Sequence, residues 1–334
     1  NCGMMAMDPM NGHVKAWIGG INYKYFKFDH ISQSKRQPGS TFKPFVYGAA
    51  IENEIVTPCD ELVDEPVTFG EEDGLSGGTW TPQNSDGKYS YQNMKMRRAM
   101  GLSINSISAK LMKQLGPDKI AEFAHKCGIN SSLNEVPSLC LGASEVSLME
   151  QVSGYSTLAN GGEKIEPILV LKITDKVGNV LREYSPPVKA VIKPETAYLM
   201  TYMLQGAVQE PGGTAEGLKR TSLVAGNEIG AKTGTTSNYS DGWFMGVTQK
   251  LVAGVWVGGD DRSIHFRSLA LGQGAKMAMP AYAKFMEKVY ADQSLAIEGY
   301  RKMPFIKPEN FVFDFSCNGR VAVDSTASQA PVTQ

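Results

Sequence analysis

The order of predicted elements along the chain indicates an α+β fold with two lobes. Strand-like segments occur near both ends of the sequence, a run of helices fills the middle, and one more helix follows the last strands. Strands from the two ends most simply share one antiparallel sheet flanked by helices, with the helical middle inserted as an all-helical lobe. A crevice between the sheet and this lobe is the natural place for a functional site.

The expected domain boundaries follow from the same order. We expect residues 1–300 to form the folded domain. Its helical lobe covers about residues 90–162, and its sheet lobe covers about residues 1–55 and 165–295. Because Pro and Ser become frequent beyond this domain, residues 301–334 are expected to form a C-terminal tail on the surface. A chain of 334 residues buries about three quarters of its unfolded surface, so it needs no disulfide or metal for stability.

The first predicted elements are a hairpin and a helix. Residues 4–7 and 14–18 are apolar and flank the turn-forming sequence Asp8–Gly12, a pattern that is typical of two paired strands. Residues 40–53 carry apolar side chains at helical spacing and a proline in the first turn, where the missing N–H costs little. Residues 57–92 are rich in Gly, Asp, Ser and Pro and are expected to form a long loop with short strands at most.

The middle of the chain is predicted to be helical, and the last third to be rich in strands. Gly and Pro separate most of the helices, whose expected ranges are 93–102, 105–115, 118–127, 145–160 and 194–208. A hairpin between the last two of these helices is expected from strands at 168–173 and 180–184. Three strands follow closely at 229–235, 243–248 and 251–257, and a helix at 281–290 closes the compact part.

Charge and composition exclude several classes of protein. The chain has 33 Lys and Arg against 34 Asp and Glu, so it has neither the basic field of a nucleic-acid-binding protein nor a polybasic membrane patch. The cysteines are odd in number and lack Cys-x-x-Cys spacing, so each is interpreted as a free structural thiol: Cys2, Cys59, Cys127, Cys140 and Cys317. The four histidines are scattered, which gives no support to a zinc site, and no metal or cofactor is expected.

Membrane and export segments are not visible in the sequence. The apolar stretch Leu251–Val257 is far shorter than the roughly 18 to 20 residues that a spanning helix needs. No cationic start followed by an apolar core is present, so no signal peptide is predicted. Because the chain opens with Asn1, we expect it to be a fragment from which any export or anchoring segment has been removed.

The candidate nucleophile lies in a Ser-x-x-Lys motif. This motif starts at Ser32, Ser40 and Ser85, but only Ser40 follows a Pro-Gly pair and has a predicted helix directly after it. At a helix start, residues i and i+3 share one face, so Lys43 is expected one turn above Ser40. The N–H groups of a helix start suit a developing oxyanion, and Lys43 could activate the hydroxyl if burial or a nearby cation kept it neutral. The simpler alternative is that Ser40 is only an N-cap.

Two further motifs favour the interpretation of Ser40 as a nucleophile over that of a simple N-cap. Ser103-Ile104-Asn105 lies at a helix-to-helix junction, although an N-cap would explain it too and Ser132–Asn134 has the same spacing. Lys232–Thr236 contains the Lys-Thr-Gly sequence on a predicted strand, where the alternative is a solvated edge strand. A phosphate loop at Gly226–Thr233 is disfavoured, because three residues instead of four separate its glycines and Ala231 precedes the lysine.

In this order the three motifs form the serine acyl-transferase set shared by penicillin-binding proteins and class A β-lactamases. The segment Arg36–Phe45 resembles the nucleophile segment of the class A (bifunctional) penicillin-binding proteins. Further stretches that resemble this family are Asp8–Gly20, Trp80–Asn84, Leu141–Gly162, Lys232–Thr236 and Asp241–Phe244. The similarity covers roughly residues 4–290, essentially a whole transpeptidase domain. Gln249 stands where many members have proline, which affects a turn, and the tail has no clear match.

The resemblance implies the fold of serine β-lactamases and penicillin-binding transpeptidases, and it implies catalytic roles for four residues. Ser40 would be acylated by the penultimate D-Ala carbonyl of a stem pentapeptide, with release of the terminal D-Ala. Lys43 would accept the Ser40 proton. Ser103 would relay protons between the two lysines and the leaving amine, and Lys232 would supply a second cation that helps to lower the pKa of Lys43.

Four more residues are implied to bind substrate. Asn105 would hydrogen-bond the side-chain amide of the stem peptide. The hydroxyls of Thr233 and Thr235, which flank Gly234, would bind the terminal carboxylate of the donor or of a β-lactam. The backbone N–H groups of Ser40 and Thr235 would form the oxyanion hole.

The resemblance also implies partners and a location. The partners would be peptidoglycan stem peptides (a D-Ala-D-Ala donor and an amine acceptor) and β-lactam antibiotics, with no nucleic acid. The location would be the extracytoplasmic face of the bacterial cell membrane. The glycosyltransferase domain and membrane anchor usual in this class are absent from this chain but expected in the full-length protein.

Three related activities remain as alternatives. A β-lactamase needs a base that hydrolyses the acyl-enzyme, but the Glu-x-x-Leu-Asn element of class A β-lactamases is absent, and Glu145 and Glu150 are interpreted as ordinary helix surface. A D,D-carboxypeptidase shares the three motifs and uses water as the acceptor, although the Arg36–Phe45 segment disfavours it. A non-enzymatic β-lactam sensor would keep acylation and lose turnover.

Overall fold

The central feature of the molecule is one antiparallel sheet. The computed structural model describes residues 1–236 and 238–317. Five of the described strands are hydrogen-bonded in the order β2-β1-β11-β10-β9. Their bounds are Cys2–Met7 (β1), Val14–Ile18 (β2), Gly230–Thr235 (β9), Asp241–Val247 (β10) and Val252–Gly258 (β11). The N-terminal hairpin and the late strands therefore share one sheet, which confirms the predicted fold class.

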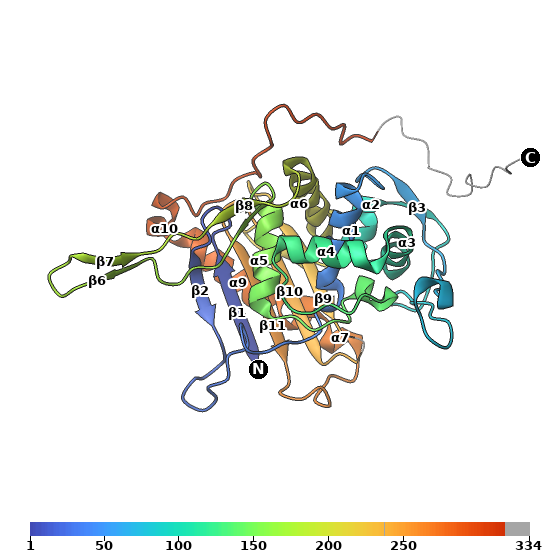
Figure 1. Ribbon diagram of the computed structural model, residues 1–334, viewed down its shortest axis with the longest axis horizontal. Helices are drawn as coiled ribbons and strands as arrows, with labels where there is room; N and C mark the ends of the chain where they lie inside the picture. Colours follow the sequence, from blue (N-terminus) through green and yellow to red (C-terminus); the bar gives the residue numbers. More distant parts are fainter. Residues whose placement is uncertain (237, 318–334) are drawn as a thin grey trace, which may run out of the picture.

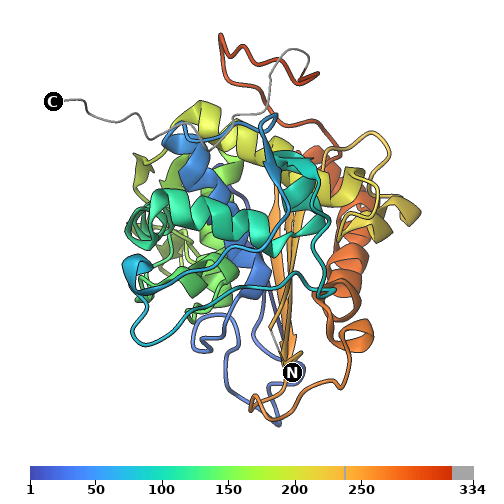
Figure 2. The same ribbon diagram turned by 90° about the vertical axis from the view of Figure 1, so that its right-hand side faces the viewer.

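Helices cover both faces of this sheet, as Figure 2 shows with the strands seen edge-on. On one face α5 (Leu148–Ala159) contacts β1, β10 and β11, and on the other α9 (Met279–Ala291) contacts β10 and β11. Because side chains alternate between the faces of a strand, Met5 joins the core cluster under α5, whereas Met4 joins the cluster under α9. Every residue of β10 is buried, so this strand is packed on both faces.

The helical lobe lies beside the sheet and surrounds one fully buried helix. Its helices are α1 (Lys43–Glu52), α2 (Met96–Leu102), α3 (Asn105–Leu115) and α4 (Pro117–Cys127), together with α5. Helix α1 packs against α3, α4 and α6 (Pro194–Gln209), and its residues 43–51 are all buried. The residues that come directly after the candidate nucleophile Ser40 in the sequence therefore lie in the interior of the molecule (Figure 1).

Two expected helices in the middle of the chain begin later than predicted. Residues 93–95 form strand β4 (Asn93–Lys95), which pairs with β3 (Glu61–Val63), so the helix starts only at Met96. The helix expected from residue 145 starts at Leu148, because Ser147 and Glu150 form a capping box that fixes its first turn.

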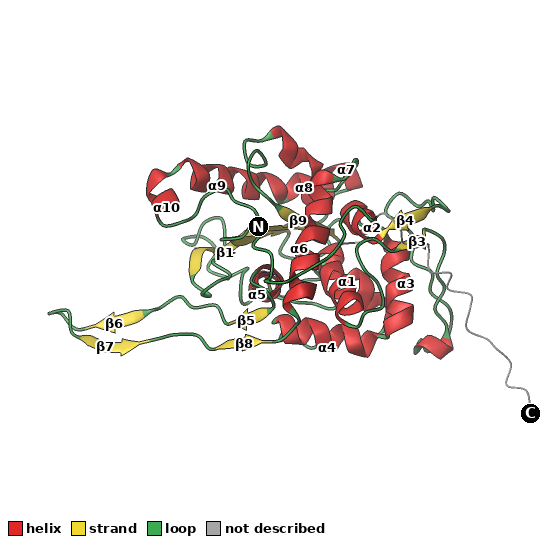
Figure 3. Ribbon diagram, turned by 90° about the horizontal axis from the view of Figure 1, so that it is seen from above, coloured by secondary structure: helices red, strands yellow, loops and turns green. Residues whose placement is uncertain are grey.

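A long ribbon projects from the body, as Figures 1 and 3 show. It contains two separate strand pairs, β5 with β8 and β6 with β7, in place of the single hairpin that was predicted. Their bounds are Glu163–Ile165 (β5), Lys172–Thr174 (β6), Val180–Glu183 (β7) and Val188–Ala190 (β8). The remaining helices are short: α7 (Leu269–Gly272), α8 (Gly274–Met277) and α10 (Gln293–Ile297). Within residues 1–236 and 238–317, no helix combines the length and the apolar character needed to cross a bilayer.

The chain after α10 packs back onto the body and is joined to it covalently. Cys317 forms a disulfide with Cys59, 258 residues earlier in the chain. The prediction of free thiols is therefore wrong for these two cysteines, because pairing over such a separation leaves no local pattern, whereas Cys2, Cys127 and Cys140 are free. The expected tail beyond residue 317 lies outside the described residues.

Candidate active site

The candidate nucleophile Ser40 lies at the junction of the sheet and the helical lobe. It belongs to a 3-10 turn, Gly39–Phe42, that leads directly into α1, so the α-helix itself starts three residues later than expected. Gly39 has a φ of +56°, and a Cβ atom there would lie 2.7 Å from the carbonyl oxygen of Thr235. Only glycine allows this backbone to approach β9 so closely, and the approach places Ser40 beside the Lys-Thr-Gly strand.

A buried ion pair holds the segment before Ser40 against the sheet. Arg36 Nε lies 2.6 Å from Asp241 Oδ1, and the Asp241 side chain is fully buried at the start of β10. The indole of Trp256 donates to the same carboxylate oxygen at 3.0 Å. The indole of Trp243 donates to the carbonyl of Gln37 at 2.9 Å. Two strands of the sheet therefore fix the position of the nucleophile segment.

Two lysine amines, both fully buried, meet at the hydroxyl of Ser103. Lys43 Nζ donates to the Ser103 carbonyl at 2.7 Å and to Asn105 Oδ1 at 2.6 Å, and it lies 3.3 Å from Ser103 Oγ. Lys232 Nζ donates to Ser103 Oγ at 2.8 Å and to the Thr233 carbonyl at 3.1 Å. Within residues 1–236 and 238–317, all the polar partners of these amines are neutral oxygens, and no carboxylate there pairs with either amine.

This arrangement favours the neutral forms of the amines. Burial lowers the pKa of Lys43 from 10.5 to about 7. Burial also brings the pKa of Lys232 well below its usual value, and the nearby charge of Lys43 lowers it further. An amine with a pKa near 7 can accept a proton at neutral pH, which is what a general base requires.

The position of Ser103 depends on a close crossing of two helices. Ser103 ends α2 in the left-handed conformation, with φ at +61°, which is a strained backbone for a residue other than glycine. Two residues earlier, α2 crosses α6 at a pair of glycines. A Cβ atom on Gly101 would lie 2.7 Å from the backbone of Gly206. The crossing therefore lets the end of α2 come deep enough for Ser103 to reach both lysines.

Asn105 is positioned by a polar network from the loop before β4. Asn84 Oδ1 accepts the N–H of Asn105 at 2.9 Å and that of Ser106 at 3.2 Å, so Asn84 caps the start of α3 from outside the helix. Asn84 Nδ2 and Ser106 Oγ both donate to Asp64 Oδ1, at 2.8 and 2.6 Å. Burial opposes ionisation of Asp64, but hydrogen bonds from Ser106, Ser90 and Asn84 outweigh it and lower the pKa of Asp64.

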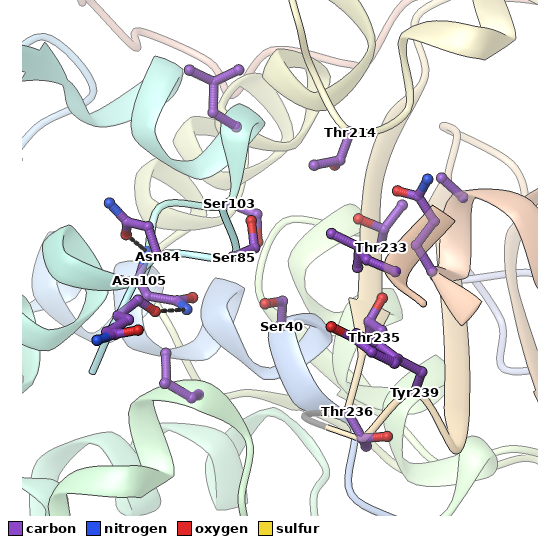
Figure 4. A pocket seen from close by; sticks show the side chains of 16 residues that line it. Ser40, Asn84, Ser85, Ser103, Asn105, Thr214, Thr233, Thr235, Thr236 and Tyr239 are labelled. Atoms are coloured by element: carbon purple, nitrogen blue, oxygen red, sulfur yellow. Dashed lines mark hydrogen bonds between the residues drawn. The ribbon is translucent and has the colours of Figure 1, made fainter. Parts of the chain in front are cut away.

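These elements surround an open cleft of about 480 Å³, shown in Figure 4. Five of the eight predicted site residues line it, namely Ser40, Ser103, Asn105, Thr233 and Thr235. The other residues of the lining are Gln83, Asn84, Ser85, Leu102, Leu141, Thr214, Thr236, Tyr239, Leu269, Gln273 and Ala275. Lys43 and Lys232 are buried beneath the surface of the cleft. Gly234 does not line it, and a Cβ atom there would lie 2.4 Å from the Pro38 carbonyl oxygen.

The wall formed by β9 presents hydroxyl groups to the cleft. Thr235 Oγ1 accepts the backbone N–H of Gly274 at 3.1 Å, at the start of α8. Because that contact uses a lone pair, the hydroxyl proton of Thr235 remains available for an acceptor in the cleft. The cleft thus contains a candidate nucleophile on one element and hydrogen-bond donors on another.

The comparison with known protein families agrees with this geometry. Residues 2–287 match the family described as "Penicillin binding protein transpeptidase domain". The chain belongs to this family. Among curated relatives, this transpeptidase domain is 34% identical over 287 residues to "Penicillin-binding protein 2D" of Bacillus subtilis, a match that covers 85% of the chain and 40% of the relative. It is 31% identical over 317 residues to "Penicillin-binding protein 1A" of Neisseria flavescens, covering 92% of the chain and 37% of the relative.

Solved structures give the same result. The crystal structure of penicillin-binding protein 1A from Haemophilus influenzae has a TM-score of 0.79 at 29% identity, covering 88% of this chain and 48% of that one. The PonA1 protein from Mycobacterium tuberculosis in complex with penicillin V has a TM-score of 0.74 at 25% identity, covering 92% and 81%. The predicted family and fold type are therefore confirmed. The transpeptidase domain spans 40% or less of the length of these two curated relatives.

The competing sequence motifs occupy other environments in the transpeptidase domain. Ser32 Oγ hydrogen-bonds to Asp29, away from the residues that line the cleft. Ser85 does line the cleft, but it lies in a loop and not at a helix start. The interpretation of Glu150 as helix surface is wrong, because this side chain is buried and accepts hydrogen bonds from Ser131 and Ser147. Glu145 is exposed, as expected, and pairs with Arg262, but it precedes α5 and does not lie on a helix.

Proposed function

We propose that this chain is a serine D,D-transpeptidase domain that cross-links peptidoglycan stem peptides through a Ser40 acyl-enzyme. The observation that carries the proposal is the Ser103 hydroxyl. It lies 3.3 Å from one buried amine and 2.8 Å from another, beside a cleft that Ser40 also lines. A hydroxyl between two amines of lowered pKa is suited to passing protons in either direction.

The acylation half-reaction uses these groups in sequence. Lys43 in its neutral form takes the proton of Ser40 as the oxygen attacks the carbonyl of the penultimate D-Ala. The backbone N–H groups of Ser40 and Thr235 stabilise the oxyanion of the tetrahedral intermediate. The peptide bond to the terminal D-Ala then breaks, and Ser103 gives its proton to the leaving amine. Ser103 is reprotonated from the lysines, and D-Ala leaves.

The second half-reaction reverses these transfers. An amine from a neighbouring stem attacks the ester carbonyl and loses a proton through Ser103 to the lysines. The ester bond to Ser40 breaks, and the Ser40 oxygen recovers its proton from Lys43. The net result is one peptide bond broken and one formed, so the reaction needs no cofactor.

Three residues bind the donor in this proposal, and a fourth, Gly234, shapes the strand that carries two of them. The Thr233 and Thr235 hydroxyls hold its terminal carboxylate, and Gly234 between them lets the nucleophile segment approach β9. Asn105 hydrogen-bonds the side-chain amide of the stem. Its own amide nitrogen now donates to the Gln83 carbonyl at 2.6 Å, so substrate binding exchanges that contact for one with the ligand.

The same proposal extends to partners and location. We infer that β-lactams acylate Ser40, in agreement with the name of the family and with a related structure that was solved with penicillin V. The proposed location is the extracytoplasmic face of the bacterial membrane, and the full-length protein is expected to carry a glycosyltransferase domain and an anchor. The Cys59–Cys317 disulfide supports this location, because disulfides persist in oxidising compartments.

The alternative activities differ in whether water, an amine or no group attacks the ester of the acyl-enzyme. A β-lactamase needs a carboxylate free to activate water, and Glu150 is occupied as the cap of α5. A D,D-carboxypeptidase would hydrolyse the acyl-enzyme, and a sensor would keep it. These activities predict different products and different lifetimes of the acyl-enzyme, which can be measured directly.

The decisive experiment is covalent labelling with a fluorescent penicillin. We expect Ser40→Ala to abolish labelling, and Ser85→Ala, in the same cleft, to leave it intact. Labelling that survives Ser40→Ala would remove Ser40 from the mechanism. Intact mass over time gives the acyl-enzyme lifetime, with loss within seconds indicating a β-lactamase. Mass spectrometry of products from a stem peptide and an amine acceptor then separates cross-linking from hydrolysis.

A further inference from the structure

Thr214 carries a hydroxyl that nothing in the proposed mechanism uses. It follows α6 and lines the same cleft as Ser40, where Figure 4 shows it across the gap from Ser103 and close to Thr233. Its Oγ1 is buried, and among residues 1–236 and 238–317 no group hydrogen-bonds to it. A buried hydroxyl without a partner is costly, so it calls for an explanation in a native structure.

The backbone around Thr214 is fixed, so the hydroxyl is not left over from a loose loop. The N–H of Gly213 bonds to the Glu210 carbonyl, that of Thr214 to the Gly101 carbonyl at 3.1 Å, and that of Ala215 to the Ala207 carbonyl at 2.9 Å. Gly101 lies two residues before Ser103, so Thr214 is tied to the helix end that carries the proton relay. Such a preorganised backbone is what a binding group requires.

The composition of the cleft indicates which ligand group needs this hydroxyl. Among the described residues that line it, none has a charged side chain. The carboxylate of a donor or β-lactam must therefore be bound mainly by neutral donors, with the amine of Lys232 below them. A carboxylate has about four lone-pair sites, and the hydroxyls of Thr233 and Thr235 fill only two of them.

We propose that Thr214 is a substrate-binding residue, whose hydroxyl completes the carboxylate subsite that Thr233 and Thr235 begin. The proposal rests on the function proposed above. A rotation of about 120° about χ1 exchanges the hydroxyl and methyl positions of a threonine, and so turns Oγ1 from the protein interior toward the cleft. The hydroxyl then donates to a carboxylate oxygen, which removes the cost of leaving it unpaired.

The matched variants are Thr214→Val, which keeps the shape and removes the hydroxyl, and Thr214→Ser, which keeps the hydroxyl. The measurement is the second-order rate constant for acylation by benzylpenicillin and by its methyl ester, which lacks the negative charge. We expect Thr214→Val to lower the rate constant for benzylpenicillin about tenfold, as for the loss of a hydrogen bond to a charged group. The rate constant for the ester should change little, and Thr214→Ser should resemble the wild type.

Thermal unfolding separates binding from a structural role. Because valine removes an unpaired buried hydroxyl, Thr214→Val should unfold at the same temperature as the wild type or higher. Equal losses with penicillin and with the ester, or a serine variant as slow as the valine one, would overturn the proposal. So would a valine variant that acylates at the wild-type rate. Failure of the wild type itself to be acylated would instead overturn the proposed function.

Discussion

The guanidinium of Arg36 and the carboxylate of Asp241 form an ion pair that joins the nucleophile segment to the central sheet. Arg36 Nε and Asp241 Oδ1 are 2.6 Å apart, although the residues are 205 positions apart in the chain. Arg36 is four residues before Ser40, and Asp241 starts the strand beside Lys-Thr-Gly. The pair therefore couples the stability of the domain to the geometry of the candidate site.

The first prediction concerns this pair. Asp241→Ala leaves the Arg36 guanidinium buried without its counter-charge, so we expect the free energy of unfolding to fall by about 3–5 kcal/mol. Acylation by penicillin should slow as well, because the segment that carries Ser40 loses its anchor. Chemical denaturation and labelling kinetics measure the two effects. As a control, Arg262→Ala breaks the exposed pair with Glu145, and the loss should be about 0–1 kcal/mol. Equal effects of the two variants would contradict the assigned role.

The second prediction concerns pH. In the proposed mechanism acylation needs neutral Lys43, whose pKa is lowered by burial to about 7. The acylation rate constant should therefore fall about tenfold per pH unit below 7 and level off above it. The profile is measured as the acylation rate constant at a series of pH values, with a penicillin whose own charge does not change over this range. A profile that stays flat through pH 7 would show that Lys43 is not the base.

The same pKa has a consequence for stability. The pKa of Lys43 is about 7 in the folded protein, whereas the unfolded chain has the ordinary value of 10.5. The folded protein therefore binds this proton more weakly than the unfolded chain does. Between about pH 7 and 10.5 the unfolded state therefore holds more protons, so this group makes stability rise with pH in that window. Lys43→Met removes this contribution and should reduce the slope of the unfolding free energy against pH over the same range, while Lys232, whose pKa is also lowered, keeps its own contribution.

The sequence predicted most of the fold because its signals are local. Short apolar runs beside turn-forming residues located the strands that share the sheet, and Gly or Pro located the ends of most helices. Of the eight site residues that the three motifs predict, five line the cleft and two, Lys43 and Lys232, are buried beneath it. One error lies at the start of a predicted helix. Residues 93–95 pair with β3 as a strand, because a partner elsewhere in the chain overrides a helical pattern.

What the sequence did not predict depends on contacts between distant residues. Nothing local marks Asp64 as the acceptor that orients Asn84, because its partners lie 20 to 42 residues farther along the chain. The disulfide between Cys59 and Cys317 was missed for the same reason. Thr214 was missed because an unpaired hydroxyl is a property of the packed structure, and no sequence pattern encodes it.

A further prediction concerns that disulfide. It joins the C-terminal segment to the loop before β3, and Phe315 in this segment packs on Tyr202 of α6. Reduction, or Cys59→Ser, should lower the free energy of unfolding by about 2–4 kcal/mol. The acylation rate should hold, since neither cysteine lines the cleft. Reductant should have no effect on the unfolding of the Cys59→Ser, Cys317→Ser double variant. A wild-type protein whose unfolding is insensitive to reductant would argue against the bond.

The last prediction concerns the glycine crossing that places Ser103. A Cβ atom on Gly101 would lie 2.7 Å from the backbone of Gly206, and one on Gly206 would lie 2.8 Å from the Arg97 carbonyl oxygen. Either alanine variant must push α2 and α6 apart, so both should lose about 1–3 kcal/mol of stability. Their effects on acylation should differ. Gly101 is two residues from Ser103, whereas the Gly206 contact lies a turn farther back in α2.

We therefore expect Gly101→Ala to slow penicillin labelling more than Gly206→Ala does at equal loss of stability. The physical reason is that, in the proposed mechanism, the Ser103 hydroxyl must stay within hydrogen-bond distance of both lysines, now 3.3 and 2.8 Å away. Labelling kinetics and denaturation on the two variants test this directly. In the contrary outcome, labelling falls only in proportion to stability in both variants. The crossing of α2 and α6 would then support the fold without positioning the Ser103 hydroxyl.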